Sequence, residues 1–255
     1  IQSFGTLTYR REDEILAFGH PLRSLGNLSM PMTTMDVHFV VPNITAASFK
    51  FGSVIEPVGT VAQDRSPAIS GRIGPQPSMI PMSVRVQSDA GDREFDFEIV
   101  DDEALAPGYI WYTTVATIGA AGKINGEYTI GLDLSIDLAG RDDPLSAGNT
   151  FSSVRAPYAA GTFTTTILTQ LLTNPFEEVV FEGVSLDLTL SERIESATIE
   201  SVRLDRHSVR PGDNLEIAIA TRRQRGDVEE TRATIEIPPE LQEGLYEIRV
   251  YDARN

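Results

Sequence analysis

The chain has 255 residues and a formal net charge of −16, and at about 150 residues per domain it should form two or three compact units. This acidic balance argues against nucleic acid and anionic membranes as partners, because phosphate-rich surfaces attract clustered Lys and Arg. No run approaches the ~20 apolar residues that span a bilayer, and the absence of cysteine excludes disulfides and thiolate chemistry.

The first predicted unit, residues 1–103, contains many short apolar segments separated by Gly and Pro, among them GTLTY, ILAFGH, MDVHFVV and MIPMSVRV. Closely spaced strands with turn residues between them are typical of a small barrel or sandwich. Residues 10–14 and 88–92 are predicted turns of the first and last hairpins. Residues 93–100 alternate apolar and charged side chains, as a half-buried strand does. We therefore expect a β-barrel segment.

The second predicted unit, residues 104–193, combines helices and strands. Residues 107–121 and 161–173 have the spacing of amphipathic helices, and a proline follows the second of them. Residues 128–138 and 184–190 alternate apolar and polar side chains, as strands with one buried face do. The pattern predicts an α+β domain.

The third predicted unit, residues 194–255, is a run of short strands separated by turns that are rich in Pro and Gly. The predicted strands are residues 199–202, 215–219, 234–237 and 245–250. About four strands in this length favour a small, incomplete immunoglobulin-like β-sandwich.

Residues that bind metals in other proteins are sparse here. His20, His38 and His207 lie in three different neighbourhoods, without the spacing of a zinc site. Asp36 and His38 share a face of a predicted strand and could ligate one ion, but such pairs are more often exposed neighbours. Further acidic residues lack the spacing of a calcium loop and favour a solvated edge. These are Asp133, Asp137, Asp142 and Asp143. We predict neither a metal nor a cofactor.

His20 lies in the stretch LAFGHPL, between a glycine and a proline and directly after an apolar run. An imidazole in this position can be presented at the rim of a barrel, where it could deprotonate a serine hydroxyl. By itself the pattern favours a histidine that closes a turn. The sequence blocks around His20 favour the catalytic interpretation instead.

Several blocks follow one another in the first unit: GTLT, ILAFGHP, SFKFG, PVGTVAQDR and ISGRIG. Together, over residues 5–100, they resemble the SpoIVB-type serine peptidases. The resemblance implies a trypsin-like barrel, and it places His20 at the position of the family's catalytic histidine.

The nucleophile of that family has no match in this sequence. Its serine lies in a Gly-Met-Ser-Gly-Ser-Pro block, whereas Ser70 here belongs to a different, glycine-rich turn of the family. The catalytic acid has no match either, and we expect Asp64 to pair with the adjacent Arg65. Loss of the serine costs on the order of 10⁶-fold in turnover. We therefore expect the chain to be inactive alone.

The sequence thus predicts a mainly β protein with a trypsin-like barrel segment, an α+β unit and a small sandwich. Because the chain starts at Ile1 and leads directly into a strand, we expect it to be part of a longer protein. The resemblance implies an exported protein of the periplasm or cell envelope, completed by an upstream segment or partner chain and acting on a protein or peptide. The alternative is a non-enzymatic envelope protein that binds or scaffolds.

Overall fold

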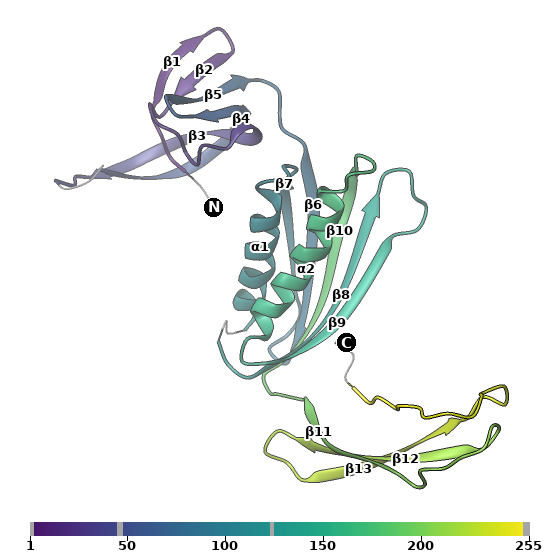
Figure 1. Cartoon of the computed structure of the whole chain (residues 1–255). Helices are drawn as coiled ribbons and strands as arrows, with labels where there is room; N and C mark the ends of the chain where they lie inside the picture. The colour runs from purple at the N-terminus through teal and green to yellow at the C-terminus, as the bar shows by residue number, and fades with distance from the viewer. Residues whose placement is uncertain (1–2, 45–47, 123–124, 252–255) are drawn as a thin grey trace.

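Strands dominate the structure. The computed structural model describes residues 3–44, 48–122 and 125–251, of which 51% are in strands and 14% in helices. Within these residues the strands form three sheets, which follow one another along the chain (Figure 1). The predicted mainly β fold is confirmed.

The first sheet is antiparallel and has five strands. In the order in which they lie side by side, they are β1 (Leu7–Arg11), β2 (Glu14–Ala17), β5 (Ala68–Ile73), β4 (Phe49–Arg65) and β3 (Gly26–Val41). The predicted turn at residues 10–14 joins β1 and β2. β5 pairs with β4 only from Gly59 onward, so residues 35–41 and 49–55 continue as a two-stranded ribbon. This ribbon, the β3–β4 arm, projects from the sheet (Figure 1).

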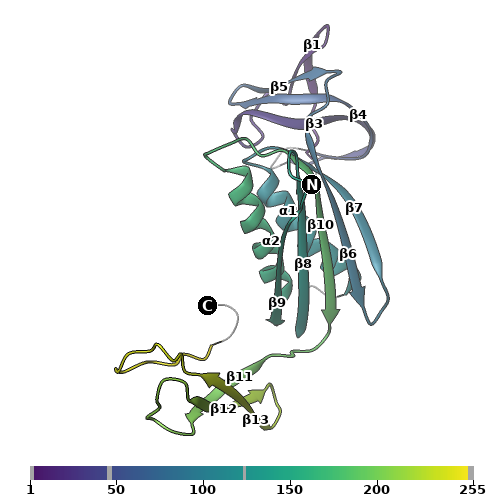
Figure 2. The same ribbon diagram turned by 90° about the vertical axis from the view of Figure 1, so that its right-hand side faces the viewer.

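The second sheet is mixed. Its strands lie in the order β7 (Arg93–Val100), β6 (Met79–Ser88), β10 (Phe181–Ser191), β8 (Tyr128–Leu138) and β9 (Leu145–Ser153). Only β6 and β10 run parallel within this sheet. Two helices, α1 (Ala106–Ala121) and α2 (Ala156–Leu172), cover one face (Figures 1 and 2). Among the described residues, neither helix is long and apolar enough to cross a membrane.

Both predicted helices are present, although α2 begins at Ala156, five residues before the predicted start at residue 161. Pro107 and Pro157 stand in the first turn, where a missing N–H leaves no hydrogen bond unmade. On α1 the buried side chains of Ile110, Thr114 and Ile118 recur every four residues and face the sheet. The core lies between the helices and the alternating apolar residues of the strands.

The boundary between the first two units lies earlier than the predicted residue 103. β6 and β7 fall within the range 1–103, yet they belong to the second sheet. β6 pairs in parallel with β10, for example Val84 with Leu186, and both side chains are buried. Alternation identifies β6 as a strand but does not reveal a partner so distant in the sequence. The first sheet therefore ends at Ile73.

The third sheet has three strands, β11 (Ala197–Leu204), β12 (Asn214–Arg223) and β13 (Val228–Glu236), in that order. The prediction of a fourth strand at residues 245–250 is wrong, because this segment is irregular and Leu245 is fully exposed. Within the described residues it pairs with neither edge strand of the third sheet. Among the described residues the unit is a single sheet.

Candidate functional site

A strained turn at the end of β2 precedes His20. The Gly19 N–H donates to the Ala17 carbonyl at 3.0 Å, and Phe18 between them has a φ of 74°. This combination is the rare γ-turn with positive φ. Such a conformation costs about 1–3 kcal/mol and persists only where the surroundings impose it. Its effect is to place the next side chain, His20, at the exposed rim of the sheet.

The Phe18 ring packs directly over the backbone of Gly5. A Cβ added at Gly5 would lie only 1.4 Å from Cε1 of this ring, so any side chain there would displace the ring. The Phe18 ring also lies 5.7 Å from the ring of His20, between centroids. The Phe18 N–H also donates to the Thr6 carbonyl at 3.0 Å. Residues 5 and 6 therefore help to orient the turn and the imidazole.

Hydrogen bonding defines the tautomer of neutral His20. Its Nδ1 lies 2.8 Å from the Pro21 carbonyl oxygen, which can only accept. Nδ1 therefore carries the proton, and Nε2 holds the free lone pair. This is the tautomer that a general base needs in order to take a proton from a hydroxyl.

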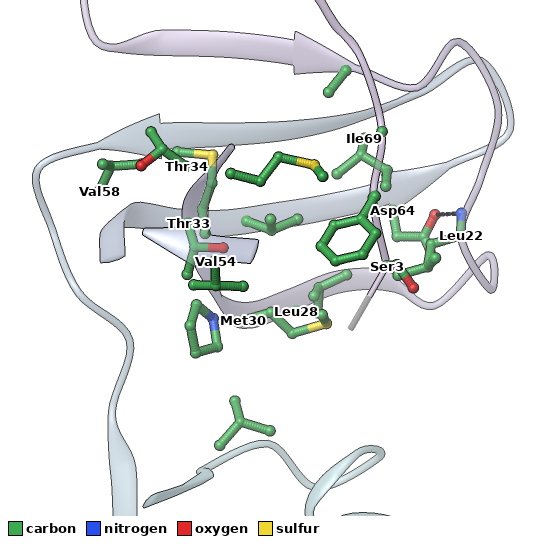
Figure 3. Close-up of a pocket in the computed structure, with 18 of the residues that line it drawn as sticks. Ser3, Leu22, Leu28, Met30, Thr33, Thr34, Val54, Val58, Asp64 and Ile69 are labelled. Atoms are coloured by element: carbon green, nitrogen blue, oxygen red, sulfur yellow. Dashed lines mark hydrogen bonds between the residues drawn. The ribbon is translucent and has the colours of Figure 1, made fainter. Parts of the chain in front are cut away.

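Asp64 anchors the chain that follows His20. Its buried carboxylate accepts the N–H groups of Leu22 at 2.7 Å, Arg23 at 2.6 Å and Leu25 at 3.3 Å (Figure 3 shows the bond to Leu22). Burial raises the pKa of Asp64, but backbone hydrogen bonds from residues 22–25 outweigh it and hold the pKa below its usual value. Asp64 is thus a positioning residue for the His20 loop.

The predicted pairing of Asp64 with Arg65 is wrong. The Arg65 guanidinium instead donates to Gln63 Oε1 at 3.2 Å and to Asn27 Oδ1 at 2.9 Å. Asp64 finds its partners more than thirty residues earlier in the chain. Because these partners are backbone N–H groups, no pattern of side chains in the sequence could have identified them.

A general base at His20 would need a serine hydroxyl within hydrogen-bonding distance. Ser70 lies within β5, paired with Leu16 on one side and Gln63 on the other, and not on the turn. In the described part of the chain, the hydrogen bond found for His20 is the one to Pro21. The structure therefore places Asp64 of β4 against the loop that follows His20, and among the described residues no hydroxyl side chain is hydrogen-bonded to the imidazole.

A histidine–serine contact does occur on the β3–β4 arm, and the sequence did not reveal it. His38 Nε2 lies 2.9 Å from Ser53 Oγ, because the hairpin register places Ser53 opposite Asp36. The Asp36 carboxylate lies 3.8 Å from His38 Nδ1, which is too long for a hydrogen bond. The side chains of Asp36 and His38 are each at least half exposed. The three residues therefore lack the fixed, buried acid of a catalytic triad.

A cavity of about 870 Å³ lies on one face of the first sheet, next to the His20 turn. Figure 3 shows Leu28, Val54 and Ile69 around it, from β3, β4 and β5. Four of the chain's five methionines line it, together with residues 97–100 of β7 and Tyr109 of α1. Methionine side chains adapt to irregular apolar shapes. Because most of its lining is apolar and the Asp64 carboxylate is already hydrogen-bonded, the cavity suits apolar groups.

Acidic and histidine residues do not gather elsewhere into a metal-binding group. No cluster of three such side chains occurs within residues 3–44, 48–122 and 125–251. Comparison with protein-family models, with curated proteins and with solved structures finds no match for this chain. The chemistry of the site is therefore inferred from its own residues.

Proposed function

We propose that the chain is the histidine-bearing part of a SpoIVB-type serine peptidase whose nucleophile comes from an upstream segment or a partner chain. The observation that carries this proposal is the His20 turn, with Nδ1 bound to Pro21 and Nε2 free to accept a proton. In acyl transfer, that nitrogen takes the proton of an attacking serine and later returns it to the leaving amine. Without the hydroxyl, no acyl-enzyme can form.

The cavity on one face of the first sheet supports the same proposal. Within the described residues β1 and β3 are the edges of this sheet, and its apolar residues, with parts of β7 and α1, surround a cavity where a packed second layer would otherwise lie. A sheet with one apolar face needs a second layer or closure into a barrel. We propose a trypsin-like barrel completed by the segment that bears the serine. An exported protein belongs to the same proposal. So does an immunoglobulin-like third unit, which is supported by the short strands and the Pro- and Gly-rich turns of residues 194–255.

A fluorophosphonate probe, which labels activated serines, tests this function. The chain alone is expected to remain unlabelled. Addition of a polypeptide with the Gly-Met-Ser-Gly-Ser-Pro block should give labelling of that polypeptide's serine. His20→Ala should abolish this labelling, and His38→Ala, the matched control, should not.

Labelling of the chain by itself would refute the proposal, and peptide mapping would identify the serine. Modification at Ser53 would show that the pair on the arm is reactive. Modification elsewhere, lost in His20→Ala, would show that the nucleophile lies within these 255 residues.

A second candidate is a non-enzymatic protein that binds or scaffolds at the cell envelope. The exposed apolar residues of the β3–β4 arm favour this function, because such surfaces mark sites of association. In this case, binding to an envelope partner should be salt-tolerant and unchanged by His20→Ala. Loss of binding in His20→Ala would argue against this second candidate function.

A further inference from the structure

The β3–β4 arm exposes an unusual amount of apolar surface. Eight large apolar side chains on it are between 37% and 62% exposed. They are Val37, Phe39, Val40, Val41, Phe49, Phe51, Val54 and Ile55. Taking 150–200 Å² for each fully exposed side chain, they leave on the order of 700 Å² of apolar surface in water. This surface is divided between the two faces of the arm, because successive residues of a strand point to opposite faces. Exposed apolar surface of this extent is typical of an interface.

The arm is also weakly supported by its own fold. Within the described residues it has two strands and no third neighbour, although Phe39 and Phe51 stack with centroids 4.9 Å apart. An isolated two-stranded hairpin is marginal in water and gains stability from a further strand or layer. A partner strand paired with the arm would supply the further strand and cover part of the exposed apolar surface.

Charge permits the arm to meet a copy of itself. The chain has a formal net charge of −16. Residues 35–41 and 49–55, however, contain one acidic residue, Asp36, and one basic residue, Lys50, whose formal charges cancel. Self-association through this arm therefore avoids the repulsion that opposes contact between the acidic bodies. Insertion into a bilayer is disfavoured, because the unpaired strand edges would lose their hydrogen bonds to water.

The free edge of β3 is complementary to itself. Met35-Asp36-Val37-His38-Phe39 reads apolar, acidic, apolar, imidazole, apolar, with Val37 at its centre. When two such strands pair antiparallel about Val37, Asp36 of each copy lies opposite His38 of the other, and Met35 lies opposite Phe39. Facing pairs of this kind stabilise a sheet, and identical patches satisfy a two-fold axis.

We propose that two copies of the chain associate through the β3 edges of their arms, antiparallel and centred on Val37. A β-bulge between Val37 and Phe39 lies within this five-residue segment and another register shift precedes Met35, so the local twist is large and the pairing stays short. Only part of the apolar surface is then covered, less than the ~800 Å² per partner of a standard interface. The dimer is consequently weak, and it does not depend on His20.

Sedimentation velocity of the full chain tests the association. We expect monomer and dimer to exchange at about 1–100 μM, as suits a small interface. Phe39→Ser combined with Phe51→Ser should raise the dissociation constant at least about tenfold. Phe176→Ser, which removes a fully exposed phenylalanine from another surface, should leave it unchanged. A chain that is monomeric throughout this range, or a dimer that the double variant does not weaken, overturns the proposal.

Single cysteines test the register, because the natural chain has none. Residues opposite each other in an antiparallel pair have Cα atoms about 4.5–5.5 Å apart, a separation that a disulfide can bridge. Val37→Cys should therefore form a disulfide-linked dimer under mild oxidation, whereas Phe176→Cys should not. Equal crosslinking of the two variants would exclude the proposed register. A monomer that binds neutral lipid vesicles instead would show that the arm has a different partner and overturn the proposal.

Discussion

Asp64→Asn tests whether one buried carboxylate holds the loop after His20. In the native chain Oδ1 accepts the N–H of Leu22, and Oδ2 accepts those of Arg23 and Leu25. Asparagine keeps one oxygen and replaces the other with an NH₂ group. Whichever way the amide turns, at least one backbone N–H then faces a donor instead of an acceptor.

The expected loss of stability follows from these hydrogen bonds. Each hydrogen bond to a charged group contributes about 1.5–3 kcal/mol, and a buried donor without an acceptor costs about 1–3 kcal/mol. We therefore expect Asp64→Asn to lower the free energy of unfolding of the first sheet by about 3 kcal/mol. The matched control is Asp13→Asn, because Asp13 forms only an exposed ion pair with Arg72 at 3.3 Å. Its expected effect is at most about 1 kcal/mol.

The loss of stability caused by Asp64→Asn must also depend on pH. Burial raises the pKa of Asp64, but hydrogen bonds from the N–H groups of Arg23, Leu22, Leu25 and Ser24 leave it below its usual value. A lowered folded pKa means that the stabilisation is complete above the unfolded pKa of about 3.9 and is lost as pH falls through the folded pKa. The difference between native chain and variant should therefore disappear in acid.

Urea unfolding from neutral pH downward, with hydrogen exchange of the Leu22 and Arg23 amides, measures this effect. We expect faster exchange of both amides in Asp64→Asn at neutral pH, and slow exchange in Asp13→Asn. A variant within about 0.5 kcal/mol of the native chain at neutral pH would refute the reasoning. A difference that stays constant into acid would refute it equally.

Three glycine substitutions test other parts of the structure. Gly161→Ala should destabilise the second unit by about 1–3 kcal/mol in thermal unfolding, because its Cβ would lie 2.8 Å from Val115 Cγ2 between the helices. Gly108→Ala, on α1 with open space around it, should instead stabilise by about 0.5–1 kcal/mol. Gly5→Ala should displace the Phe18 ring and shift the imidazole NMR signals beside it, without changing the unfolding of the second unit. Unchanged imidazole signals, or the same sign for both helix variants, would contradict the packing described here.

Much of the second unit could be predicted because its sequence pattern and its burial agree. Residues 128–138 alternate strictly, and the structure has a strand with the same bounds, whose apolar face is buried under the helices. Residues 107–121 and 161–173 were expected to be helical, and both helices begin a few residues earlier at most, with a proline in the first turn. Local sequence patterns are sufficient to predict a helix or strand when one of its faces is buried in a single core.

Pairing between distant segments could not be predicted in the same way. The parallel contact of β6 with β10 moves two strands from the first unit to the second. Residues 245–250 were predicted to be a strand, but among the described residues they pair with neither edge of the third sheet and are irregular. At the site, the sequence identified His20, but Asp64 depends on backbone donors brought close by folding. Each missed feature is a contact that spans many residues.

The identity of residue 18 bears on how His20 is oriented. A glycine adopts a φ of 74° without strain, so a turn that merely ended β2 would gain stability from glycine at this position. The chain has phenylalanine there, with a glycine at position 5 that leaves room for the ring. The ring lies against His20, and Asp64 fixes the residues on the other side. This arrangement gives up backbone stability to restrict one imidazole, which is what the proposed function requires of a general base whose hydroxyl comes from another segment.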